Sequence, residues 1–126
     1  MHDLIVDLSN ACRDSRLGIS RKHADWGRLT LLIDIWRRDI NSDTDFYFVA
    51  DNSLARHFDG PDGDRLRSLA ERGDCIQVPH ADREILRRAY ATGASVLSCD
   101  KFAAERREFP WVDDDQQHFW DWEVSE

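Results

Sequence analysis

The chain has 126 residues, of which 41% are hydrophobic, and this length suits one domain with a single modest core. No apolar run approaches the roughly 20 residues that cross a bilayer, and the start lacks the basic and apolar regions of a secretory signal, so we expect a cytoplasmic protein without a membrane segment. The three cysteines have neither Cys-x-x-Cys nor zinc-finger spacing, which argues against disulfides and structural zinc.

The formal net charge is -8, whereas proteins that bind nucleic acid mainly through phosphate contacts are normally basic. This objection is only partial. Divalent cations held by clustered carboxylates reverse the local field that a phosphate experiences. Much of the negative charge also lies in one segment, residues 113–126.

In chain order, four short apolar runs predict strands at residues 4–6, 46–50, 75–78 and 94–97. The runs are mostly continuous rather than alternating, as expected for strands covered on both faces. Apolar residues at helical spacing predict helices at about residues 28–38 and 82–92. Residues 53–72 are predicted to be helical in two pieces, separated by a turn at residues 60–63.

This alternation of strands and helices predicts an α/β fold. With right-handed crossovers it becomes a three-layer, Rossmann-like arrangement, in which a central parallel sheet of about four strands has helices on both faces. No repeat or linker divides residues 1–112, which we expect to form one domain. Residues 113–126 are acidic and rich in tryptophan; we expect them either to pack on the sheet, with an edge strand at residues 118–124, or to bind a partner.

Aspartates stand at or after the carboxyl end of every predicted strand: Asp7, Asp51, Asp82 and Asp100. Ligands in an open parallel sheet collect at this edge. Clustered carboxylates resist joint ionisation unless a cation neutralises them, and Mg²⁺ and Mn²⁺ prefer such oxygen ligands. These ions can activate water for phosphodiester hydrolysis. Each aspartate alone also has a structural explanation, as a turn residue or a helix N-cap, and only their joint placement favours a metal site.

Short motifs surround three of these aspartates, and a fourth segment matches as a strand: residues 4–10 (LIVDLSN), 81–86 (ADREIL) followed by Ala89-Tyr90, 93–102 (GASVLSCDKF), and 46–49 (FYFV). In order and spacing they resemble the NYN branch of PIN-like nucleases, most closely the Regnase-type ribonucleases, whose domain is attached to a CCCH zinc finger. The resemblance runs from about residue 4 to residue 112.

The resemblance implies a PIN-like fold and cleavage of single-stranded or looped RNA that depends on Mg²⁺ or Mn²⁺. It implies Asp7, Asp82 and Asp100 as catalytic metal ligands, with Asn10 positioning the metal-bound groups or the phosphate. Ala81 stands where the family often has a second acid, and Asp51 is a candidate to replace that charge. Because the chain contains no zinc finger, RNA targeting would come from the domain itself, from a protein partner or from a second copy of the chain.

Basic residues near the predicted site are candidates for phosphate contacts. They are Arg83 and Lys101, together with Arg13, Arg16, Arg21 and Lys22 in the long link that we expect after the first strand. The alternative for each is a solvated surface.

Three functions stay open. The first is a metal-dependent endoribonuclease, acting as a toxin, as a defence effector or in RNA turnover. The second is a PIN-like module that binds RNA or protein without catalysis. The third is a phosphoaspartyl domain of the receiver or phosphatase kind, with Asp51 or Asp7 as the acceptor.

Overall fold

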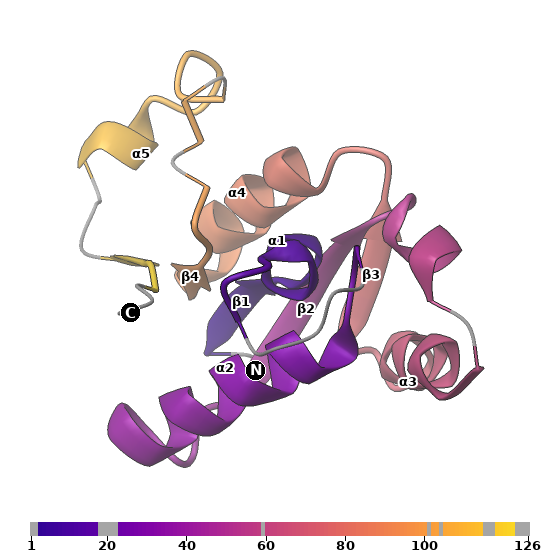
Figure 1. The fold of residues 1–126 in the computed structure, drawn as a ribbon. Coiled ribbons are helices and arrows are strands. Elements are labelled where there is room, and N and C mark those ends of the chain that lie inside the picture. The colour runs from indigo at the N-terminus through magenta and orange to yellow at the C-terminus, as the bar shows by residue number, and fades with distance from the viewer. Residues whose placement is uncertain are drawn as a thin grey trace.

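A computed structural model describes residues 3–17, 23–58, 60–100, 102–103, 105–114 and 118–122. It is an α/β structure with one parallel sheet flanked by helices (Figure 1), which confirms the predicted fold class. The sheet has five strands: the four predicted, and a fifth at the place of the edge strand expected within residues 118–124. The elements are β1 (Leu4–Asp7), α1 (Leu8–Arg13), α2 (Trp26–Asp39), β2 (Phe46–Asp51), the 3-10 helix η1 (Leu54–His57), α3 (Gly60–Glu71), β3 (Cys75–Val78), α4 (Ala81–Thr92), β4 (Ser95–Leu97), α5 (Trp111–Asp114) and β5 (Phe119–Trp120).

The strands lie in the order β3-β2-β1-β4-β5, and every neighbouring pair is parallel. From central β1 the chain winds outward through β2 and β3, and then returns to place β4 on the opposite side of β1. The direction of winding therefore reverses between β1 and β4, the position at which open α/β sheets usually bind ligands. Val6 of β1 pairs with Leu97 of β4, so Asp7 and Ser98 follow at the carboxyl ends of these two strands.

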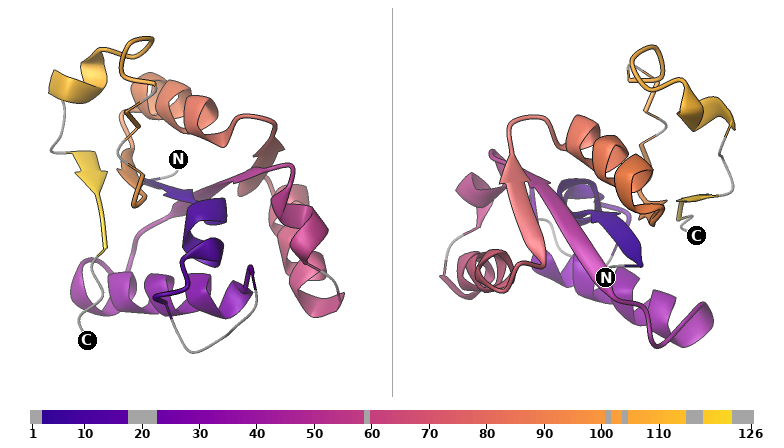
Figure 2. Two further views of the ribbon diagram at one scale, coloured as in Figure 1. Left: turned by 45° about the horizontal axis from the view of Figure 1, so that its top comes forward. Right: turned by 180° about the vertical axis from the view of Figure 1, so that it is seen from behind.

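Two cores cover the two faces of the sheet, because successive strand residues point to opposite sides. Leu4, Val6 and Phe48 pack with α1, α2 and α3, whereas Ile5 and Val49 pack with α4. Figure 2 shows α4 on one side of the sheet and α1 and α2 on the other. Burial on both faces explains why the strands read as continuous apolar runs.

Two helices begin where the sequence did not predict them. Residues 8–13 were expected to be part of a link, but they form α1, and the side chain of Asp7 caps it by accepting a hydrogen bond from the backbone N–H of Asn10. The turn expected at residues 60–63 is the first turn of α3, where Pro61 fits because its missing N–H has no partner in a first turn. None of the helices in the described part of the chain has the length and apolarity that a bilayer crossing requires.

The described part of the C-terminal segment packs against the sheet. Phe119–Trp120 forms β5, which pairs with β4. Trp122 is buried on the α1 side, and its indole N–H donates to Asp14 at 2.7 Å. Trp120 contacts Trp36 of α2 edge to face, with 5.1 Å between ring centroids. This segment therefore lies along the edge of the sheet next to β4.

Candidate active site

Asp7 ends the central strand and lies in the interior, with 4% of its surface exposed. One carboxylate oxygen accepts from the backbone N–H of Asn10 at 3.2 Å, and the other accepts from the hydroxyl of Ser98 at 2.8 Å. Burial raises the pKa of Asp7 to about 6, against the lowering effect of these two hydrogen bonds, and the charges of Asp100 and Asp51 raise it further. A buried carboxylate in this state favours a proton or a cation beside it.

Asp82 lies in the first turn of α4, at the same end of the sheet. The N-cap of α4 is His80, so the structure does not assign Asp82 the capping role that its sequence position suggests. Partial burial raises the pKa of Asp82, and the charges of Asp100 and Asp7, a hydrogen bond with the Asp100 side chain and the charge of Glu105 raise it further. Asp82 and Asp100 therefore lie close enough to favour a shared proton over two negative charges.

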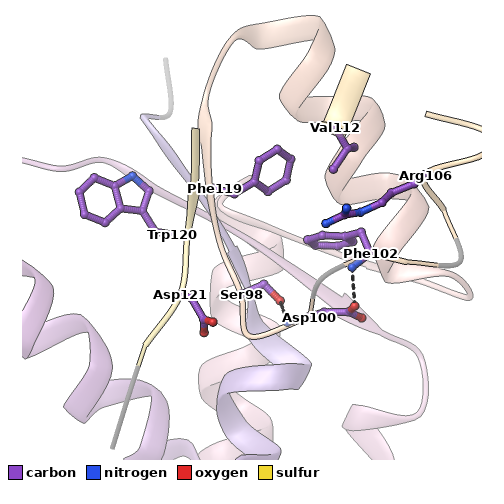
Figure 3. A pocket seen from close by; sticks show the side chains of 8 residues that line it. All are labelled: Ser98, Asp100, Phe102, Arg106, Val112, Phe119, Trp120 and Asp121. Carbon is purple, nitrogen blue, oxygen red and sulfur yellow. Dashed lines mark hydrogen bonds between the residues drawn. The ribbon is translucent and has the colours of Figure 1, made fainter. Parts of the chain in front are cut away.

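Asp100 is held by the tight loop that follows β4 (Figure 3). Its backbone N–H donates to the hydroxyl of Ser98 at 3.0 Å, and its carboxylate accepts from the backbone N–H of Phe102 at 2.7 Å. Phe102 has a φ of 55°, a conformation that is uncommon for residues other than glycine, and its ring is fully buried. The packing of Phe102 and the hydroxyl of Ser98 thus fix Asp100 relative to Asp7.

All three aspartates predicted as metal ligands lie at the same end of the sheet, within range of one another's charge. Among the described residues, none of the three forms a salt bridge with lysine or arginine. Nor is any group of three or more His, Cys, Asp or Glu side chains in this part of the chain arranged to hold a metal ion. The donors are all carboxylate oxygens, the chemistry that Mg²⁺ and Mn²⁺ prefer. Burial, first, and then the charges of the neighbouring carboxylates raise the pKa values of Asp7 and Asp82.

Asp51, the fourth aspartate at this edge, has a cationic partner. Its carboxylate forms a salt bridge with Arg13 at 2.9 Å and accepts from the hydroxyl of Ser53 at 2.6 Å and the backbone N–H of Leu54 at 2.9 Å. Partial burial alone would raise the pKa of Asp51, but the hydrogen bonds from Ser53 and Arg13 and the charge of Arg13 lower it. Asp51 therefore needs no metal ion to stay ionised.

The residues predicted to contact substrate have other partners in the structure. The side-chain carbonyl of Asn10 accepts from the backbone N–H of Cys99 at 2.8 Å, which ties α1 to the loop carrying Asp100. Arg13 pairs with Asp51, and Arg83 pairs with Glu108. Lys101 lies outside the described residues, as do Arg21 and Lys22. Of this set, Asn10 is the one that holds the aspartate cluster in shape.

Sequence reasoning missed three polar residues beside the cluster. Ser98 joins Asp7 to Asp100, Glu105 lines a cavity of about 270 Å³ together with Asp82, and Asp121 lines a cavity of about 70 Å³ together with Ser98 and Asp100. Asp121 follows β5 as Asp7 ends β1, so the same rule finds it once β5 is recognised. Nothing in the sequence around Glu105 indicates its position.

Comparison of the chain with protein-family models and with curated proteins gives no match. The relationship to PIN-like nucleases stays a prediction from the motifs.

Proposed function

We propose that the protein is a PIN-like, metal-dependent endoribonuclease that hydrolyses phosphodiester bonds in single-stranded or looped RNA. The observation that carries the proposal is the cluster of Asp7, Asp82 and Asp100. These residues come from three distant parts of the chain, meet at the switch point of the sheet, and form no salt bridge within the described part of the chain. Acids with raised pKa values in such a position are typical of functional sites.

In this proposal Asp7, Asp82 and Asp100 hold Mg²⁺ or Mn²⁺, and Asp121 and Glu105 supply further carboxylates at the border of the site. The bound cation would activate a water molecule and neutralise charge on the phosphate during in-line hydrolysis. The protein orients the ligands: Ser98 and the N–H of Asn10 hold Asp7, and the N–H of Phe102 holds Asp100. Because the cluster favours protons when it is empty of cations, binding of a cation would release them.

The alternative phosphoaspartyl function finds little support in the geometry. Both oxygens of Asp7 accept hydrogen bonds inside the protein, and Asp51 is engaged by Arg13 and Ser53. Asp7 is buried, and the carboxylate of Asp51 is held by Arg13 and Ser53 although Asp51 lines the cavity of about 270 Å³ that also contains Asp82. The alternative of a PIN-like module without catalysis draws on Ala81. This residue is the first of α4, is buried in the core, and gives the cluster no carboxylate.

The proposal is tested by incubating the purified protein with a labelled single-stranded RNA and Mn²⁺, with and without EDTA. We expect cleavage that disappears with the chelator and in the Asp7→Asn and Asp100→Asn variants. The matched control is Asp51→Asn, which changes an aspartate at the same edge and should keep most of the activity. Equal cleavage by all variants would assign the activity to a different site, and binding of RNA without cleavage would favour the module without catalysis.

A further inference from the structure

A further cavity, of about 230 Å³, lies between the C-terminal half of α4, α5 and β5. Its walls include the rings of Tyr90, Trp111, His118 and Phe119 over a floor that includes Ala94. Pockets for drug-sized ligands measure roughly 300–1,000 Å³, so this cavity suits one small planar group. Tyr90 is 71% exposed, which leaves the cavity open to solvent at the surface of α4.

The aromatic rings form a row that leads toward the aspartate cluster. Ring centroids lie 5.7 Å apart between Tyr90 and Trp111, 5.8 Å between Trp111 and Phe119, and 5.9 Å between Phe119 and Phe102. Phe119 also lines the cavity that contains Ser98 and Asp100, so the two cavities share a wall. Figure 3 shows the rings of Phe119 and Phe102 on the same side of Asp100.

The cavity offers a ligand mainly flat aromatic and apolar surface. The indole N–H of Trp111 is buried and has no acceptor among the described residues, but it is too covered to donate to a group inside the cavity. Flat aromatic walls and a small volume together fit a nucleobase.

We propose that this cavity binds one base of a single-stranded nucleic acid whose backbone continues to the aspartate cluster. The inference rests on the proposed nuclease function for the direction of the backbone. Asp82 and Tyr90 are eight residues apart on α4, which separates them by about 12 Å along the helix axis. A strand held at both places would span a few nucleotides. Stacking of a base on an aromatic ring tolerates any base, so the cavity selects unpaired strands more than sequences.

The test measures binding of a fluorescent single-stranded RNA octamer by anisotropy, in EDTA so that no cleavage occurs. The Tyr90→Ala variant should bind about tenfold more weakly, because one stacking wall is lost. Tyr90→Phe, which keeps the ring, should bind as the wild type does. Trp111→Phe, which keeps an aromatic ring in the wall, should bind about as the wild type does. The matched control is Leu31→Ala, which removes a partly exposed apolar side chain from α2 on the opposite face.

An abasic octamer, which has the backbone but no bases, distinguishes base stacking from electrostatic binding of the phosphates. The wild type should prefer the normal octamer over the abasic one, and Tyr90→Ala should lose most of this preference. Equal binding of both octamers by the wild type, equal binding by Tyr90→Ala, or no binding by the wild type would overturn the cavity proposal. Cleavage in Mn²⁺ with a KM unchanged by Tyr90→Ala would overturn it and leave the nuclease proposal intact. Base-dependent binding by a protein that cleaves no RNA would support the cavity proposal and contradict the nuclease proposal.

Discussion

Asp7 and Asp51 end neighbouring parallel strands, yet their carboxylates are in opposite electrostatic states. Arg13 and Ser53 surround Asp51, and the pKa of Asp51 is below its ordinary value. Burial and the charge of the nearby Asp100 raise the pKa of Asp7, and the same two effects raise the pKa of Asp82. Position at the carboxyl end of a strand therefore does not decide the ionisation of an acid. The degree of burial and the presence or absence of a cationic partner decide it.

The largest difference between the aspartate cluster and the Asp51–Arg13 pair should appear in the rate of RNA cleavage. Asp82→Asn removes a ligand from the cluster, and we expect the rate of RNA cleavage in Mn²⁺ to fall roughly a thousandfold, the order of loss seen when one group that stabilises a transition state is removed. Asp51→Asn should reduce the rate by less than about tenfold, because it alters only the neighbouring pair with Arg13. Similar losses of rate in the two variants would mean that Asp51 takes part in cleavage as much as Asp82 does.

The stability of the metal-free protein should also distinguish Asp7 from Asp51. We expect replacement of Asp7 to stabilise the fold and replacement of Asp51 to destabilise it. The pKa of Asp7 rises from 3.8 to about 6 on folding, so its ionisation opposes folding above about pH 6, and this effect fades on acidification to about pH 4. Asp7→Asn should therefore stabilise the metal-free protein by about 2 kcal/mol near pH 7.5 and give no gain below about pH 4.

Asp51→Asn should destabilise the protein near neutral pH, because a lowered pKa contributes stability that is lost as the pH falls. Urea denaturation of both variants in EDTA measures these effects. A destabilised Asp7→Asn variant near pH 7.5 would show that Asp7 is a structural residue whose charge the fold needs.

The two serines that donate to these aspartates should differ in the same way. Ser98 donates to Asp7 and accepts from the N–H of Asp100, so Ser98→Ala should weaken Mn²⁺ binding about tenfold by releasing both ligands. Ser53→Ala removes the corresponding bond to Asp51 and should leave Mn²⁺ binding unchanged. Isothermal titration calorimetry compares the two. Equal weakening would mean that Asp51 belongs to the metal site.

The smallest expected effect concerns Arg13. Arg13→Gln removes the cation beside Asp51. The pKa of Asp51 should then rise, as that of Asp7 does, because the charge of Arg13 no longer opposes the effect of partial burial. Carbon-13 NMR titration of the carboxyl groups measures this change. An unchanged pKa of Asp51 would show that the bonds from Ser53 and Leu54 suffice to keep it low.

The sheet and its acidic edge could be predicted from the sequence because both depend on simple periodicity. The apolar runs define the strands, and parallel topology then places Asp7, Asp51, Asp82 and Asp100 at one end. Helix α1 was missed because it is six residues long and includes Ser9 and Asn10, which have modest helix propensity. Its cap, Asp7, had been assigned to a turn or a metal site.

The partners of each acid could not be predicted from the sequence. The bond between Arg13 and Asp51 joins residues 38 positions apart, and the bond between Ser98 and Asp7 joins residues 91 positions apart. Such contacts depend on how loops and side chains pack after the sheet has formed. The positive φ of Phe102, which holds Asp100 in place, is equally a result of packing, since nothing local favours it.

Binding of Mn²⁺ by the metal-free protein tests the central claim most directly, with the unbound ion followed by its electron paramagnetic resonance signal. The account predicts that the wild type and Asp51→Asn bind the ion alike, and that Asp7→Asn and Asp100→Asn bind it at least about tenfold more weakly. Wild-type affinity in the Asp7→Asn and Asp100→Asn variants, or an equal loss in Asp51→Asn, would contradict it.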